Sequence, residues 1–124
     1  MTKKKIVQAA KDAIGAARRK EPFEDTIVEF KRELPDAKKA AERMAAMANA
    51  ARSEDFIWVV GVADNGEVVG AKRMELADWF PQVQKHFEGP VPKPKDHLFK
   101  YEGHTMHAIC FSSSEAPYVI KDED

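Results

Sequence analysis

The chain has 124 residues, of which 44% are hydrophobic and 33% charged, with a net charge of −1 at pH 7. These values are typical of one ordinary soluble domain with a single core. No apolar run approaches the roughly 20 residues needed to span a bilayer. Cys110 is the one cysteine, which excludes a disulfide framework and a cysteine-based metal site. The lysine-rich start leads into a polar, alanine-rich segment, so we expect no signal peptide and a reducing, cytoplasmic location.

The first expected element is a helix over residues 3–19. Apolar residues recur there at three- and four-residue spacing and form one stripe, namely Ile6, Ala9, Ala10, Ala13, Ile14 and Ala17. Thr2 can cap its start, and Pro22 ends it. Residues 1–20 carry seven Lys or Arg against one Asp. Such a basic segment can contact phosphates, although a solvated helix face is the commoner explanation.

Residues 26–31 are expected to form a strand. Alternation places Val28 and Phe30 on one face, and Ile27, Glu29 and Lys31 on the other. A carboxylate beside an ammonium suits phosphate chemistry, because the first can hold a divalent cation and the second can neutralise a phosphate oxygen. The alternative is an edge strand whose charged face is simply solvated.

A second helix is expected to open at Pro35-Asp36 and to end near residues 49–51. Its buried stripe is made of small residues and can pack close to a sheet. Residues 56–62 then form an almost unbroken apolar run, which is typical of a strand buried on both faces. Asn65-Gly66 favours a tight turn, followed by a return strand over residues 67–71. This hairpin places Asp64 at the end of a buried strand, where sites often lie.

A third helix is expected to begin at Asp78 as its cap, to include Phe87 and to stop at Gly89-Pro90. Strands over residues 98–101 and 105–112 follow a proline-rich connector, and a last strand covers residues 118–120. The predicted order is α-β-α-β-β-α-β-β-β. We therefore expect an α+β fold with a mixed, mainly antiparallel sheet and helices packed on it.

Several chemistries find no support in the sequence. His104 and His107 are three residues apart on the expected hairpin, so they face opposite sides and are expected to be turn and surface residues. Ser112-Ser113-Ser114 has no partner that would make a nucleophile. The glycines match neither a phosphate-binding loop nor a dinucleotide fingerprint. A nucleotide-cofactor enzyme and a serine or cysteine hydrolase are therefore not supported.

What remains is an acidic set, Glu24, Glu29 and Asp64, with Lys31 nearby. Hard oxygen ligands of this kind suit Mg²⁺ or Mn²⁺, which can support phosphodiester hydrolysis. Composition alone does not single out these three acids from the 21 in the chain.

Three stretches in order resemble the Schlafen AlbA-type domain family. They are Glu24 with residues 28–31, then residues 44–50, then residues 60–70. The resemblance covers roughly residues 21–120 and includes the late Ala116-Pro117-Tyr118. It divides the chain into an N-terminal basic helix, residues 1–20, and a Schlafen AlbA-type domain, residues 21–124, within one domain overall.

The resemblance implies nucleic-acid binding. In the family's nuclease branch, two glutamates five residues apart and a later aspartate form a metal-dependent site that cleaves structured RNA, including tRNA. Those positions match Glu24, Glu29 and Asp64, which would hold Mg²⁺ or Mn²⁺, while Lys31 would stabilise charge on the phosphate. The alternative is a non-catalytic DNA- or RNA-binding regulatory module. A third alternative is an interaction domain whose acids are merely on the surface.

We expect RNA as the favoured partner, with DNA as an alternative, and no membrane. The candidates for contacts to the nucleic-acid backbone are Lys3, Lys4, Lys5, Arg18, Arg19 and Lys20. The sequence departs from the family at residues 52–55, Arg-Ser-Glu-Asp, where relatives usually carry a Gly-Gly pair. Eukaryotic relatives also clamp RNA between two such lobes, whereas this chain has one, and a homodimer could rebuild the cleft.

Overall fold

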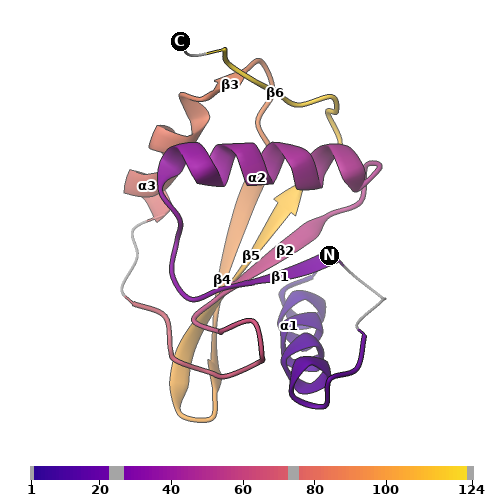
Figure 1. Cartoon of the computed structure of the whole chain (residues 1–124), viewed down its shortest axis with the longest axis vertical. Coiled ribbons are helices and arrows are strands. Elements are labelled where there is room, and N and C mark those ends of the chain that lie inside the picture. Colours follow the sequence, from indigo (N-terminus) through magenta and orange to yellow (C-terminus); the bar gives the residue numbers. More distant parts are fainter. Residues whose placement is uncertain (1, 23–26, 73–75, 123–124) are drawn as a thin grey trace.

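The computed structural model describes residues 2–22, 27–72 and 76–122. A four-stranded sheet runs through the middle of the molecule, with one helix on each side. Helix α1 (Lys3–Arg18) lies behind the sheet in Figure 1, and α2 (Ala37–Ala50) crosses in front of it. Helix α3 (Leu76–Gln84) lies beside α2. No described helix is long and apolar enough to cross a membrane.

The strand order in the large sheet is β1-β2-β5-β4. The strands are β1 (Ile27–Lys31), β2 (Phe56–Val60), β5 (His104–Ser112) and β4 (Lys93–Tyr101). Strand β1 runs parallel to β2, and the other two pairings are antiparallel. A second small sheet pairs β3 (Phe87–Glu88) with β6 (Val119–Ile120). The predicted α+β class, with a mixed and mainly antiparallel sheet, is confirmed.

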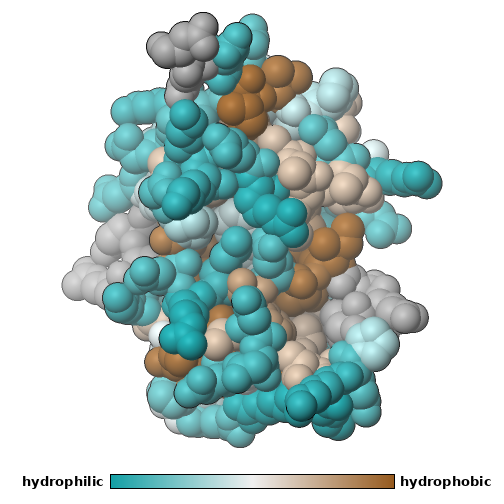
Figure 2. Space-filling model, in the orientation of Figure 1, coloured by the Kyte–Doolittle hydropathy of each residue, from teal (hydrophilic) through white to brown (hydrophobic). Residues whose placement is uncertain are grey.

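The core on the α2 side of the sheet is aromatic. Trp58, Phe56 and Phe111 are fully buried there, and the two phenylalanine rings stack with centroids 5.1 Å apart. Helix α2 covers them with alanines and methionines, whose small or flexible side chains let the helix lie close to the rings. The outer surface on this side is mostly hydrophilic, with only small apolar patches (Figure 2).

The core on the α1 side is aliphatic. Ile6, Ala10 and Ile14 form the buried stripe of α1 and pack against Ile57 and Val59 of β2. The side chain of Thr2 caps the helix by accepting a hydrogen bond from the backbone N–H of Lys5, as predicted. Helix α1 is therefore part of the same packed unit as the sheet.

The return strand expected after β2 is reduced to a single antiparallel bridge between Val62 and Val68. Gly61 (φ 108°) and Gly70 (φ 81°) have left-handed backbone conformations. They bend the chain away from the regular hydrogen-bond pattern of a β-sheet. A Cβ on Gly61 would lie 2.6 Å from the backbone nitrogen of Ala71, so this close approach requires glycine. Strand β5 takes the free edge of β2 instead.

Helix α3 and strand β4 have boundaries that differ from the sequence-based expectation. Asp78 lies in the first turn of α3 and is not its cap, and Phe87 belongs to β3 instead of the helix. Strand β4 begins at Lys93, earlier than expected, and contains Pro94. An edge strand accepts a proline because its outer side needs no N–H donor.

Candidate functional site

Glu29 and Lys31 lie on the α2 face of the sheet. Their parallel register pairs Glu29 with Trp58 and Lys31 with Val60, both members of the α2-side core. Val28 and Phe30, which alternate with them along the strand, pack against the α1-side core. The predicted division of β1 into two faces is therefore confirmed.

The Glu29 carboxylate lies between two cations. Its oxygens accept hydrogen bonds from Arg43 Nε at 2.9 and 3.1 Å, and Arg43 Nη2 lies 2.8 Å from Oε1. The hydrogen bond to Glu29 raises the pKa of Arg43. Lys31 Nζ lies 3.4 Å from Oε2 and 4.9 Å from the centroid of the Trp58 ring. We call Glu29, Lys31 and Arg43 the β1–α2 charge cluster.

Asp64 is not bonded to this cluster. It is exposed on the turn after β2, and the neighbouring Gly66 packs against the backbone of Ile14 in α1. No hydrogen bond or ion pair joins Asp64 to Glu29 or to any other residue that the structure describes. Glu24, the third predicted acid, lies outside the described residues. The structure therefore brings Glu29 and Lys31 together, and does not bring Asp64 into contact with them.

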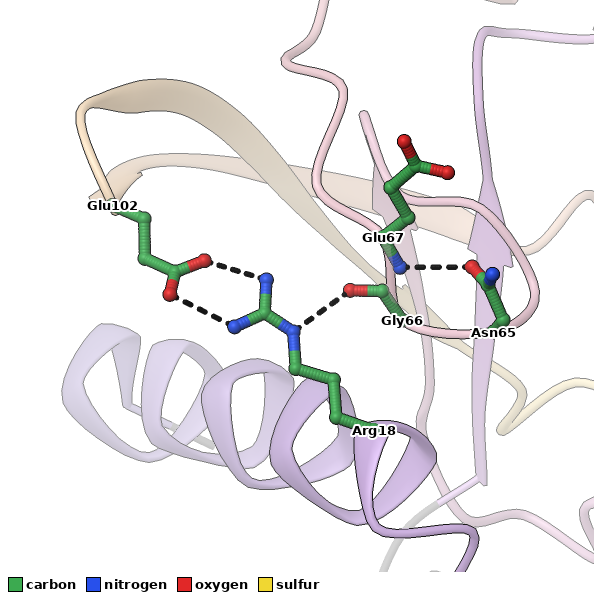
Figure 3. Close-up of polar contacts among 5 residues, drawn as sticks. All are labelled: Arg18, Asn65, Gly66, Glu67 and Glu102. Atoms are coloured by element: carbon green, nitrogen blue, oxygen red, sulfur yellow. Dashed lines mark hydrogen bonds and ion pairs between the residues drawn. The ribbon is translucent and has the colours of Figure 1, made fainter.

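The turn that carries Asp64 is held by Arg18 at the end of α1 (Figure 3). Arg18 Nε donates to the carbonyl of Gly66 at 3.1 Å, and its two terminal nitrogens contact the Glu102 carboxylate at 2.8 and 2.5 Å. The guanidinium carbon also lies 5.4 Å from the centroid of the Tyr101 ring. This bidentate hydrogen bonding raises the pKa of Arg18 and lowers that of Glu102.

The six predicted basic residues fall into two groups. Lys3, Lys4 and Lys5 are exposed in the first turn of α1, and the other three lie at its far end, about 22 Å away for a helix of this length. At that end Arg18 ties two turns together, and Arg19 pairs with Glu21 at 3.0 Å. The lysines at the start of α1 form no ion pair with a described residue. The Lys20 side chain likewise forms no ion pair with a described residue, so these four lysines are available to another partner.

The predicted metal ligands lie only partly within the described residues, because Glu24 is outside them. No three His, Cys, Asp or Glu side chains in residues 2–22, 27–72 and 76–122 are grouped so that they could hold a metal ion. Glu29 is neutralised by Arg43 and Lys31, and Asp64 is not in contact with it. The described residues therefore do not fit a metal ion by themselves.

The expectation that His107 is a surface residue is wrong. Its side chain is 10% exposed on the α2 face, and its Nδ1 lies 2.9 Å from Asp96 Oδ2 of the adjacent strand β4. His104, at the start of β5, is exposed as expected. The Asp96–His107 pair could not be predicted from the sequence, because it depends on the register between two strands.

Arg43 is the member of the charge cluster that the sequence-based interpretation missed. It lies on α2, flanking the buried stripe, 14 residues after Glu29. The order strand, helix, strand could have indicated Arg43. A helix that links two parallel strands lies over the sheet, so side chains that flank its buried stripe can reach the edge strand.

The segment that replaces the family's Gly-Gly pair keeps a backbone typical of glycine. Arg52 (φ 50°) and Ser53 (φ 72°) both lie in the left-handed region directly after α2. Nearby, Asn49 links α2 to the end of the chain: its Nδ2 donates to the carbonyl of Tyr118 at 2.9 Å, and its Oδ1 accepts from the N–H of Tyr118 at 2.7 Å. The asparagine of this motif is therefore a structural residue here.

Comparisons with known proteins agree with this fold. The family model described as "Schlafen, AlbA_2" matches residues 24–123. A search of curated proteins found no match. Among solved structures, the crystal structure of the DIP2311 protein from Corynebacterium diphtheriae is similar, with a TM-score of 0.64 and 18% sequence identity. The match covers 93% of this chain and 23% of that one, so this chain spans about a quarter of its structural relative.

The family match covers most of the chain and includes every element from β1 to β6. The chain therefore belongs to the Schlafen AlbA_2 family. Membership of this family is consistent with nucleic-acid binding. The likeness to the DIP2311 protein shows a shared fold. Helix α1 precedes the residues that the family model matches and packs on the same sheet.

Proposed function

We propose that this protein binds structured RNA such as tRNA and cleaves it as a divalent-metal-dependent endoribonuclease. Family membership supports the nucleic-acid partner. The observation that supports the chemistry is the placement of Glu29 beside Lys31, with Nζ 3.4 Å from the carboxylate, on the face of an edge strand. A carboxylate and an ammonium at this spacing can act on the same phosphate group.

In this proposal Glu24, Glu29 and Asp64 are the ligands of Mg²⁺ or Mn²⁺, and Lys31 neutralises charge on the phosphate. The metal would lower the pKa of a water molecule and stabilise the leaving oxygen. Cation binding at Glu29 requires Arg43 to leave the carboxylate. The Arg43 side chain is 51% exposed and that of Glu29 24%, so Arg43 can swing into solvent when a cation takes its place.

The second candidate is a non-catalytic DNA- or RNA-binding regulatory module. One observation favours it: Arg43 and Lys31 already neutralise Glu29, and the described residues assemble no group of three metal ligands. In that case the β1–α2 charge cluster is a structural link between the strand and the helix. Binding then depends on salt and is unaffected by loss of the Glu29 charge.

The deciding experiment incubates labelled tRNA, single-stranded DNA and double-stranded DNA with the protein in Mn²⁺, in Mg²⁺ and in EDTA. The proposal predicts metal-dependent cutting of tRNA that Glu29→Gln abolishes while binding persists. Glu33→Gln is the matched control, because Glu33 is an exposed acid close in sequence that pairs with Lys72. Salt-dependent binding without cutting supports the regulatory module, and absence of both contradicts a nucleic-acid role.

Assembly is a separate part of the proposal. Two copies of the chain would supply the two lobes that eukaryotic relatives carry in one polypeptide. Light scattering at micromolar concentration, with and without tRNA, measures this directly. A mass that stays that of one chain in both conditions contradicts the homodimer.

A further inference from the structure

Two lysines distant in sequence from the N-terminus are part of the same surface as the first turn of α1. Lys93 and Lys95 of β4 line a pocket of about 310 Å³ together with Ile6 of α1. Lys3 lies three residues, about one helical turn, before Ile6 in α1. Lys4 and Lys5 share that turn.

The strand register explains why both β4 lysines face the same way. Lys93 pairs with Ser112, and Lys95 pairs with Cys110, a member of the α1-side core. Residues two apart on a strand point to the same face. The early start of β4, at Lys93, is what places both side chains beside α1.

The charge on this surface is not neutralised by the described part of the protein. Lys3, Lys93 and Lys95 are exposed, and none of them forms an ion pair with a described residue. Asp55 is the acid among the residues that line the pocket. Burial raises the pKa of the Cys110 thiol to about 11, so this side chain adds no charge at neutral pH.

We propose that Lys93 and Lys95, together with Lys3, Lys4 and Lys5, form a binding surface for the phosphate backbone of nucleic acid. We call these five residues the α1–β4 lysine surface. Two ammonium groups line the hollow, and three more lie in the first turn of the helix that borders it. Together they complement a chain of phosphates, and lysine contacts each phosphate as a point charge without reading sequence. This inference rests on the proposed nucleic-acid function and assigns the surface that carries its affinity.

The surface lies away from the β1–α2 charge cluster. Strands β4 and β1 are the two edges of the sheet, about 14 Å apart at the usual strand spacing. The lysines are on the α1 face, and Glu29 is on the α2 face. Affinity and any chemistry at Glu29 are therefore separable by substitution.

The test measures binding of a fluorescein-labelled RNA hairpin by anisotropy over about 50–200 mM salt. Lys93→Gln/Lys95→Gln should weaken binding about tenfold and reduce the slope of log K against log salt by about 1.5, because two phosphate contacts are lost. Lys38→Gln/Lys39→Gln is the matched control, since it removes two exposed lysines from α2, and it should stay within about twofold.

A second variant should change the affinity in the opposite direction. Asp55→Asn removes the acid that lines the pocket, so it should strengthen binding about two- to threefold. Circular dichroism melting of each variant confirms that it is folded.

Four outcomes overturn the assignment. Equal losses in Lys93→Gln/Lys95→Gln and its control would mean that only net charge matters. Lysine-dependent binding to vesicles of anionic phospholipid, without binding to RNA, would identify a lipid partner. Failure of the unmodified protein to bind RNA at low salt would overturn the proposed function as well, whereas tight binding that is indifferent to the β4 lysines overturns this surface alone.

Discussion

The two faces of the central sheet carry their charges in different ways. On the α2 face, Glu29 lies between Arg43 and Lys31 at the edge of an aromatic core. On the α1 face, Lys93 and Lys95 border a pocket and pair with no described acid. Paired charges hold a strand to a helix, whereas unpaired charges of one sign attract an oppositely charged partner. The difference separates a candidate reaction site from a candidate binding surface.

The largest expected effect tests whether the two faces form one folding unit. Trp58→Ala empties the α2-side core and should cost about 4 kcal/mol, and Ile14→Ala in the α1-side core should cost about 3 kcal/mol. Urea denaturation followed by circular dichroism measures both. One shared transition is expected for each variant, and two separate transitions would show that α1 folds apart from the sheet.

A smaller loss is expected where α2 is tied to the end of the chain. Asn49→Ala removes both hydrogen bonds to the backbone of Tyr118 and leaves two buried partners unpaired, so it should cost about 2 kcal/mol. Asn49→Asp is the informative comparison, because it keeps the acceptor and loses the donor. A cost near zero for Asn49→Ala in the same urea experiment would show that the link is not formed.

Substitution at the segment after α2 should stabilise the protein. Ser53→Gly places glycine at a left-handed position and should raise the free energy of unfolding by about 0.5–1 kcal/mol, once the extra flexibility of the unfolded chain is deducted. Ser114→Gly, at an exposed position elsewhere, serves as the control and should destabilise or have no effect. A loss of stability in Ser53→Gly would contradict the left-handed backbone.

The smallest effect concerns the ion pair at the end of α1. Arg18 lowers the pKa of Glu102 below its ordinary value of 4.5, so the stabilisation is fully present above that pH and is lost as pH falls through the folded-state pKa. The difference in Tm between the unmodified protein and Glu102→Gln should therefore shrink as the pH is lowered from 7 to below 4.5. A difference that is constant across this range would contradict the pairing.

Local patterns allowed much of the fold to be predicted. The stripe of α1, the alternation on β1 and the continuous apolar run of β2 each report the surroundings of consecutive residues, and all three are present in the structure. The cap at Thr2 is a hydrogen bond to a residue only three positions away, so it could also be predicted from the sequence.

Features that depend on contacts between distant segments could not be predicted from the sequence. The return strand after Gly66 is a single bridge because β5, far along the chain, occupies the edge of β2. His107 is buried because Asp96 of β4 reaches it, and Arg43 meets Glu29 only once α2 is laid over β1. Each of these contacts is set by packing and register, which no periodicity reveals.

The candidate site was predicted in part. Alternation alone put Glu29 and Lys31 on one face, and the structure agrees. The position of Asp64 on a turn against α1 follows from the contact between Gly66 and Ile14, which the sequence does not show. The gathering of Lys93 with the N-terminal lysines likewise required the register of β4.

The central claim is that chemistry and affinity lie on opposite faces of the sheet. The most direct test measures binding and cleavage of labelled tRNA in Mn²⁺ by two variants side by side, Glu29→Gln and Lys93→Gln/Lys95→Gln. We predict that the first binds like the unmodified protein and does not cut, and that the second binds about tenfold more weakly and still cuts when saturated with tRNA. If both variants lose binding to the same extent, or if Glu29→Gln cuts at the unmodified rate, the division between the two faces is wrong.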